Sequence, residues 1–199
     1  MMSLVVSLGI LFAMAAGVIL YAVSGYNTLA TSRDRVKNAF AQIGVQLRRR
    51  YALIPSLVGT ARDSLQNEVE VLEAVIPACD AAECAAVCAS ESPGAALAMR
   101  ALGDAESVLS GALGQFLGVA GQRYDLMANQ EMLNLLGRLT TTEQKIASSR
   151  RAYNDAVVTY NRTRKRFPAS LVANNFGFAA AELFVVRQPA ENVAQPVLV

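Results

Sequence analysis

Side chains capable of acid–base, nucleophilic or metal chemistry are few in this chain, and their spacing argues against a catalytic centre. The 199 residues include no His, which removes the commonest general base and the commonest metal ligand. Glu143, Arg150 and Asp155 fall in one long predicted helix at separations that scatter them around it, without a nucleophile beside a base. We therefore predict no catalytic residue and no enzymatic activity, and we interpret these charges as partners in ion pairs between neighbouring helices.

Three cysteines, Cys79, Cys84 and Cys88, lie in an alanine-rich segment. On a helix, their spacings of five and four residues do not bring three thiolates together as a zinc knuckle does. An odd number of cysteines does not indicate a disulfide framework, and free thiols suit a reducing compartment. We interpret them as small helix-packing residues, and we predict no bound metal and no cofactor.

Composition indicates one membrane anchor followed by one domain. Hydrophobic residues make up 53% of the chain and the mean hydropathy is +0.31, which is too apolar for an ordinary soluble protein. The net charge of +2 is too small to predict a nucleic-acid partner.

The N-terminal segment predicts a transmembrane helix. No charged side chain occurs from Met1 to Ser32, and Leu4 to Val23 supplies 20 mostly apolar residues, about the ~20 needed to cross a bilayer core. The alternative is a cleaved signal peptide, but the basic region that should precede its apolar core is absent. The expected anchor residues are Leu4, Val5, Leu8, Ile10, Leu11, Phe12, Val18, Ile19, Leu20 and Val23.

The orientation of this anchor follows from its flanks. Arg33, Arg35, Lys37 and Arg48–Arg50 all come after the span, and no Lys or Arg comes before it. Because positive charge stays on the cytoplasmic side, we expect a single-pass protein of the inner (cytoplasmic) membrane, with the N-terminus outside and the bulk in the cytoplasm.

Apolar residues recur at helical spacing after the anchor. One stripe begins at Val36 and continues to Ile76, and a seven-residue repeat runs from Met132 to Phe167. We expect a kink or break just before Pro55 and boundaries at Pro77 and at Ser90–Gly94. The predicted bundle core is Val36, Phe40, Ile43, Leu47, Tyr51, Ile54, Met132, Leu139, Ile146, Tyr153, Tyr160 and Phe167.

These elements predict an all-α fold: an N-terminal transmembrane helix, then an up-and-down bundle of three to four long helices with a short C-terminal helix around 179–186. The domains are the anchor at 1–25, the bundle at 26–187 and an extended tail at 188–199.

A first arm continuous to Ile76 would lie parallel to the long third helix and pair opposite charges. Residues expected to contact lipid headgroups or neighbouring helices are Arg48, Arg49, Arg50, Arg162, Arg164, Lys165 and Arg166.

Several short motifs resemble those of the LemA family. They cover 26–58 and 124–178, and Tyr124-Asp125 departs from the family's usual Tyr-Pro. The matching stretches include Tyr26-Asn27, Arg33–Asn38, Ala41–Ile43, Gln46-Leu47, Arg49–Tyr51, Leu53–Pro55, Thr142-Glu143, Ile146-Ala147, Arg150-Arg151, Tyr153–Val157, Tyr160-Asn161, Phe167-Pro168 and Phe176–Phe178.

The resemblance implies a membrane-anchored helical bundle without an established enzymatic activity. A related branch, the magnetosome protein MamQ, takes part in forming magnetosome membranes, and family members often accompany an HtpX-type membrane protease. We therefore expect a structural scaffold that contacts membrane lipid and self-associates, with the glycine-rich helix at 101–121 as one contact face. The alternative is an adaptor that recruits or presents a membrane protein partner.

Overall fold

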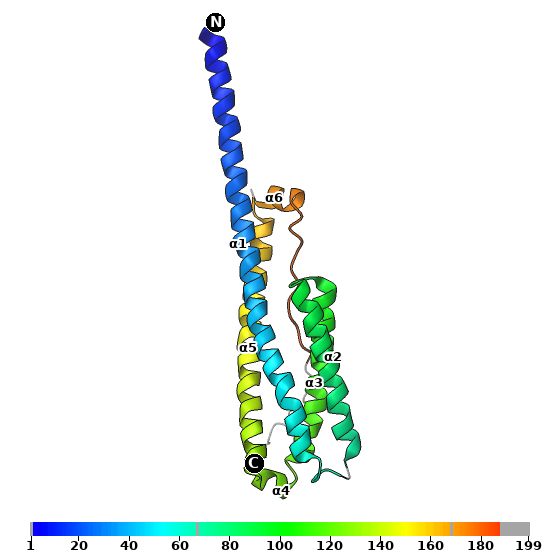
Figure 1. Cartoon of the computed structure of the whole chain (residues 1–199). Helices are drawn as coiled ribbons and strands as arrows, with labels where there is room; N and C mark the ends of the chain where they lie inside the picture. Colours follow the sequence, from blue (N-terminus) through cyan, green and yellow to red (C-terminus); the bar gives the residue numbers. More distant parts are fainter. Residues whose placement is uncertain (1, 67, 168, 188–199) are drawn as a thin grey trace, which may run out of the picture.

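The computed structural model describes residues 2–66, 68–167 and 169–187, and the described part of the chain contains helices but no strand. The predicted all-α bundle is therefore confirmed. The long helices run alternately down and up the molecule, and the short ones lie at its ends (Figure 1). The helices are α1 Met2–Ala61, α2 Val69–Glu91, α3 Ala96–Ala120, α4 Tyr124–Ala128, α5 Gln130–Lys165 and α6 Ala169–Asn175.

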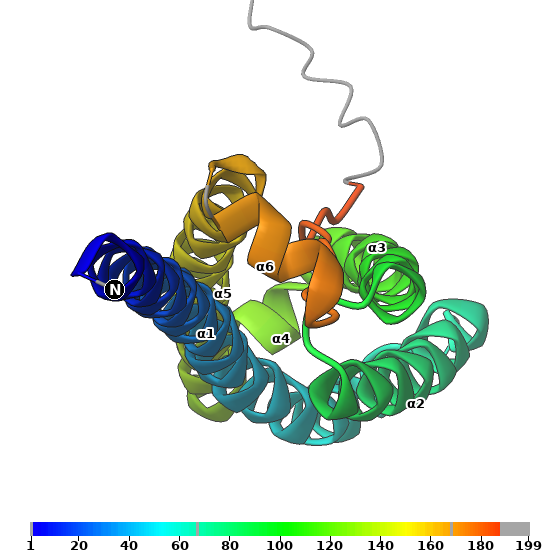
Figure 2. The same ribbon diagram turned by 90° about the horizontal axis from the view of Figure 1, so that it is seen from above.

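The four long helices form an open ring when seen along the bundle (Figure 2). Helix α5 packs on α1, α1 on α2 and α2 on α3. Helices α1 and α5 are antiparallel, since Phe40 contacts Tyr153 in a T-shaped ring pair at 5.7 Å while the later residue Arg50 meets the earlier residue Glu143. The predicted parallel alignment of the first and third arms is therefore wrong.

The reason lies in where the first arm breaks. Helix α1 continues through Pro55 without a break, and α2 continues through Pro77, which is therefore not the expected boundary. The chain reverses between Ala61 and Val69 instead, around the fully buried Leu65. The apolar spacing passes through this turn without interruption, and it therefore gives no signal of the reversal.

Helix α1 tolerates Pro55 because a side chain replaces part of the missing hydrogen bond. A proline has no N–H for the carbonyl four residues earlier, which here belongs to Tyr51. The thiol of Cys79 on α2 donates to this carbonyl, with Sγ and O 3.9 Å apart. The contact gives Cys79 a structural role at the packed face of α1 and α2.

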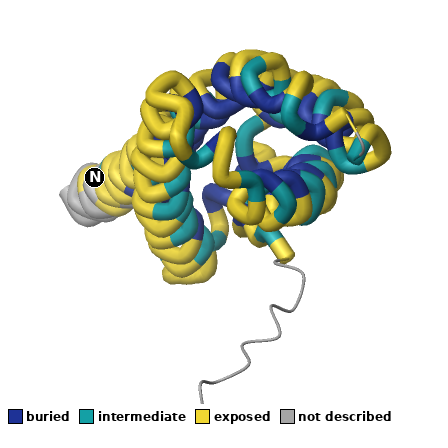
Figure 3. Tube along the Cα trace, turned by 90° about the horizontal axis from the view of Figure 1, so that it is seen from below, coloured by how far each residue is buried: buried dark blue, intermediate teal, exposed yellow. Residues whose placement is uncertain are grey.

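The core lies inside the ring, where the buried faces of the long helices meet (Figure 3). Eleven of the twelve predicted core residues are buried. Phe167 corrects the list, because its side chain is 72% exposed. The heptad pattern reaches Phe167, but α5 ends at Lys165, so the side chain leaves the buried stripe.

After α6 the chain turns at Gly177, whose φ of +69° suits glycine, and runs back along the bundle as an extended segment. We call residues 178–187 the strap. The expected short helix at 179–186 is wrong: the short C-terminal helix is α6, and the strap forms no helix. The predicted tail at 188–199 lies outside the described residues.

A search of the described residues finds no helix both long and apolar enough to cross a membrane. Leu11, Phe12, Leu20 and Val23 of the expected anchor are exposed. The side chains of Leu4, Val5, Leu8, Ile10, Val18 and Ile19 lie outside the described part of the structure, so the anchor stays a prediction.

The close packing of the strap on α3 predicts that two glycine substitutions change the free energy of unfolding in opposite directions. A Cβ at Gly103 would lie 2.3 Å from the backbone oxygen of Val185, whereas one at Gly137 would meet nothing within 4 Å. We expect Gly103→Ala to destabilise the full-length protein by about 1–3 kcal/mol through overpacking. We expect Gly137→Ala to stabilise it by up to ~1 kcal/mol through helix propensity.

Denaturant unfolding in detergent micelles, followed by helical circular dichroism, measures both changes. Equal effects of the two substitutions would show that the strap does not pack against α3 as described.

Candidate functional site: the strap groove and the buried ion cluster

Two asparagines of α5 hold the strap, and each bonds both the N–H and the carbonyl of one strap residue. The side chain of Asn161 donates to the carbonyl of Ala181 at 2.8 Å and accepts from the N–H of Ala181 at 3.1 Å. Asn154 does the same with Phe184, at 3.2 and 2.9 Å. Each amide thus takes the place that a neighbouring strand would have in a sheet.

Two tyrosines next to these asparagines add a second row of contacts. Tyr160 donates to the carbonyl of Ala179 at 2.7 Å, and Tyr153 donates to the carbonyl of Glu182 at 2.8 Å. Burial raises the pKa of both hydroxyls, so both stay protonated and act as donors. Both hydroxyls thus have the hydrogen-bond partner that a buried tyrosine needs.

The spacing of the contacts along α5 matches their spacing along the strap. Moving back from Tyr160-Asn161 to Tyr153-Asn154 is seven helical residues, or about 10.5 Å at ~1.5 Å per residue. The bonded strap residues advance by three over the same interval, which is about 10 Å at ~3.4 Å per residue. A heptad repeat on α5 therefore matches an extended chain in steps of three, and consecutive repeats hold it without strain.

The other side of the strap binds α3 and the turn before it. The N–H of Glu182 donates to the carbonyl of Gly94 at 2.9 Å, and the N–H of Arg187 donates to the hydroxyl of Ser107 at 2.8 Å. Gly94 has a φ of +90°, which glycine adopts readily. The strap therefore joins α5 to α3 and closes the ring of helices.

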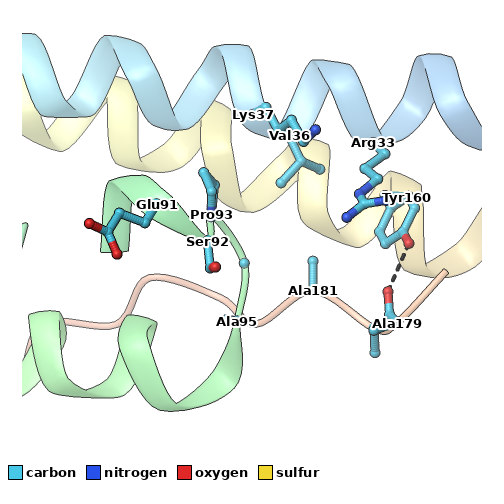
Figure 4. A pocket seen from close by; sticks show the side chains of 12 residues that line it. Arg33, Val36, Lys37, Glu91, Ser92, Pro93, Ala95, Tyr160, Ala179 and Ala181 are labelled. Atoms are coloured by element: carbon cyan, nitrogen blue, oxygen red, sulfur yellow. Dashed lines mark hydrogen bonds between the residues drawn. The ribbon is translucent and has the colours of Figure 1, made fainter. Parts of the chain in front are cut away.

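A cavity of about 330 Å³ opens beside the strap and is lined by α1, the α2–α3 turn and the strap. Figure 4 shows Arg33 next to Tyr160, whose hydroxyl is engaged with Ala179. Burial raises the pKa of Tyr160, and the positive charge of Arg33 offsets part of that rise. Lys37 and Glu91 also line the cavity, but it contains no nucleophile paired with a base.

A second polar group lies inside the bundle. Arg50 of α1 is 2% exposed and forms ion pairs with Glu106 of α3, which is also buried, and with Glu143 of α5, at 2.9 Å from Nη1 to Oε1. Tyr51 donates to the other oxygen of Glu106 and contacts the carbonyl of Ala82 at 3.2 Å. One arginine thereby links three long helices.

The electrostatics of this ion cluster suit a fixed link and not proton transfer. Burial opposes the charge of Arg50, but the carboxylates of Glu106 and Glu143 more than offset it and raise its pKa. Burial, followed by the charge of Glu106, raises the pKa of Tyr51. Arg50 therefore stays charged and Tyr51 stays protonated.

The structure separates the predicted charge contacts into two kinds. Arg50 and Glu143 are interhelix partners, and Arg164 donates to the carbonyl of Phe178 at 3.2 Å. Arg150 and Asp155 do not join the ion cluster. The remaining predicted contacts are exposed: Arg48, Arg49, Arg162, Lys165 and Arg166.

Periodicity and charge did not predict the roles of Glu106, Asn154 and Asn161. Glu106 carries a detectable signal, because a carboxylate between Leu102 and Leu109 on an apolar helix face needs a buried partner. The asparagines carry none, since their partners are backbone groups of a segment expected to be helical.

The cysteines are free, and Cys79 alone of the three is buried. Burial, helped by the nearby carboxylates of Asp80 and Glu83, raises the pKa of Cys79 to about 11. Its thiol is therefore protonated at neutral pH, as its donation to Tyr51 requires. Within the described residues no group of His, Cys, Asp or Glu could hold a metal ion.

Residues 39–198 match the family model of the LemA family. The chain belongs to the LemA family. No curated protein matches it. The paired motifs Tyr153-Asn154 and Tyr160-Asn161, which contribute to the resemblance of this LemA-family chain, are the residues that hold the strap.

The ion cluster predicts that replacing its two carboxylates destabilises the protein by unequal amounts. Glu106→Gln leaves Arg50 buried with only the half-exposed Glu143, and we expect it to destabilise the protein by about 3–5 kcal/mol. Glu143→Gln removes a solvent-screened partner and should cost less than about 1 kcal/mol. Replacing Arg50 by Met together with Glu106 by Leu should recover most of the loss, because no charge then remains unpaired.

Unfolding free energies from urea titration of the three full-length variants check this order. A loss in Glu106→Gln no larger than in Glu143→Gln would contradict the buried pair.

Proposed function

We propose that this LemA-family protein is a membrane-anchored helical scaffold that organises the inner membrane by self-assembly. The observation that carries the anchor is the exposure of apolar side chains near the start of α1. Leu11, Phe12 and Leu20 are exposed on a helix that projects beyond the bundle (Figure 1). Apolar surface in water costs roughly 25 cal/mol per Å², so such a helix favours lipid.

The partners of the polar side chains inside the bundle support a structural function. Arg50, Glu106 and Glu143 bind one another, and Tyr153 and Tyr160 donate to the strap backbone. These groups serve packing and register. We infer that the protein acts through its surfaces and not through catalysis.

Helix α3 offers a face for a second copy. Gly114 and Gly118 are exposed, lie four residues apart, and have nothing within 4 Å of the place of a Cβ. Two helices can approach closely at such a pair. Val108 of α3 and Val87 of α2 are exposed as well.

The second candidate is an adaptor that recruits or presents a protein partner, such as an HtpX-type membrane protease. An apolar groove between α1 and α2 favours it. The groove has a volume of about 810 Å³, lies where α1 ends and α2 begins, and is lined by Pro55, Val58, Leu72, Ile76 and Pro77 among others.

The native thiols test the topology. With the bundle in the cytoplasm, an impermeant maleimide should leave the wild type unlabelled in intact cells, and Ser3→Cys should gain one adduct. After permeabilisation, mass spectrometry should find two adducts on the wild type, because Cys84 and Cys88 are exposed while Cys79 is buried and protonated. Labelling of Cys84 and Cys88 in intact cells would reverse the topology.

Mass measurement of complexes extracted from native membranes separates scaffold from adaptor. A scaffold should give multiples of the 21.2 kDa chain, and replacing Gly114 and Gly118 by Leu should reduce them to single chains. Glycine-to-leucine replacement of the exposed Gly137 is the control. Purification with a second protein at fixed stoichiometry, without homotypic complexes, would favour the adaptor.

A further inference from the structure

Exposed aromatic and apolar side chains gather at the end of the bundle from which α1 projects. Tyr21 and Tyr26 belong to α1, Phe167 follows α5, Leu171 belongs to α6 and Phe176 precedes the turn to the strap. Phe176 is 65% and Leu171 59% exposed. We call these five residues, with the neighbouring cations Arg162, Lys165 and Arg166, the collar.

Contacts between the elements fix the shape of the collar. The rings of Tyr21 and Phe167 are 6.0 Å apart, and those of Tyr26 and Phe176 are 5.6 Å apart. The exposed rings of α1 are thus held against the segments on either side of α6. The aromatic residues of the collar therefore lie together, although they come from distant parts of the sequence.

Helix α6 lies across the end of the bundle, as Figures 1 and 2 show. It buries Ala169, Val172 and Ala173 and leaves Leu171 on the outside. Helix α6 packs closely on α1, since a Cβ at Gly25 of α1 would lie 3.5 Å from Cγ2 of Val172 of α6. Because α6 lies across the direction of α1, a flat surface crossed by α1 would face the exposed side of α6 along the length of that helix.

The collar carries one sign of charge. No Asp or Glu occurs between Ala156 and Ala181, whereas Arg162, Arg164, Lys165 and Arg166 lie there. On α1, no charged residue precedes Arg33, and the exposed Asp34 follows it. Arg164 is engaged with the strap carbonyl of Phe178. Arg33, Arg162, Lys165 and Arg166 are exposed and take part in no ion pair among the described residues.

We propose that the collar is a docking surface for an anionic lipid bilayer, in which the aromatic side chains sit at headgroup level and the cations bind lipid phosphates. Tyrosine and other amphipathic rings prefer the membrane interface, and each Lys or Arg near an anionic surface strengthens binding. The proposal rests on the proposed anchor, because α1 and the collar then meet the same bilayer. It adds that the bundle stands against the membrane and is not held away from it.

The absence of native Trp makes a single introduced Trp a specific reporter. Phe176→Trp and Leu171→Trp report on the collar, and Phe12→Trp reports on insertion of α1. Tyr124→Trp is the matched control, because Tyr124 is 87% exposed and belongs to α4, at the opposite end of the bundle. Each full-length variant is reconstituted in vesicles of phosphatidylcholine with or without phosphatidylglycerol, with brominated acyl chains as quencher.

We expect both collar tryptophans to lose emission and shift to shorter wavelength in vesicles with phosphatidylglycerol, while Tyr124→Trp does not change. Replacing Arg162, Lys165 and Arg166 by Gln should reduce the quenching of Phe176→Trp. Quenching of Phe12→Trp without any change in the collar reporters overturns the collar but leaves the anchor intact. An unquenched Phe12→Trp overturns the anchor, and an equal collar response in the two kinds of vesicle overturns the anionic-lipid assignment.

Discussion

The structure depends on the match between a helical heptad and an extended chain. Helix α5 presents Tyr-Asn pairs seven residues apart, and the strap presents backbone groups at intervals of three residues over the same length. Without these contacts, the backbone groups of residues 179–184 would need water, and the ring would stay open between α5 and α3. One repeat therefore closes the bundle and satisfies a segment that has no strand beside it.

The buried ion cluster fixes the level at which the helices meet. A charge such as that of Arg50 is costly inside a protein unless its partners arrive together, and those partners come from α3 and α5. A shift of either helix by one turn would leave Arg50 or Glu106 buried without a partner. The ion cluster thus specifies register, while the apolar core supplies most of the stability. Cys79 has a comparable local role, because it donates to the carbonyl that Pro55 leaves without its helical partner.

The two ends of the bundle differ in chemistry, and this difference organises the proposed function. One end carries the projecting start of α1, the cross-lying α6, aromatic side chains and the exposed cations Arg162, Lys165 and Arg166. The other holds the α1–α2 reversal and an apolar groove. A scaffold with this polarity would place one end on lipid and present the other, together with the glycine face of α3, to copies or partners.

The sequence alone determined the all-α class, the long α5 and the core-facing stripes of α1 and α5, because helical periodicity records which face each helix buries. Eleven predicted core residues are buried, and the Tyr-Asn motifs contribute to the resemblance to the LemA family. Tertiary structure decided what periodicity does not encode. The reversal after Ala61 and the antiparallel pairing of α1 with α5 depend on packing between helices, since the apolar spacing continues through the turn. The extended strap, the exposure of Phe167 and the convergence of Arg50 with Glu106 depend on contacts between residues far apart in the chain, which no local pattern contains.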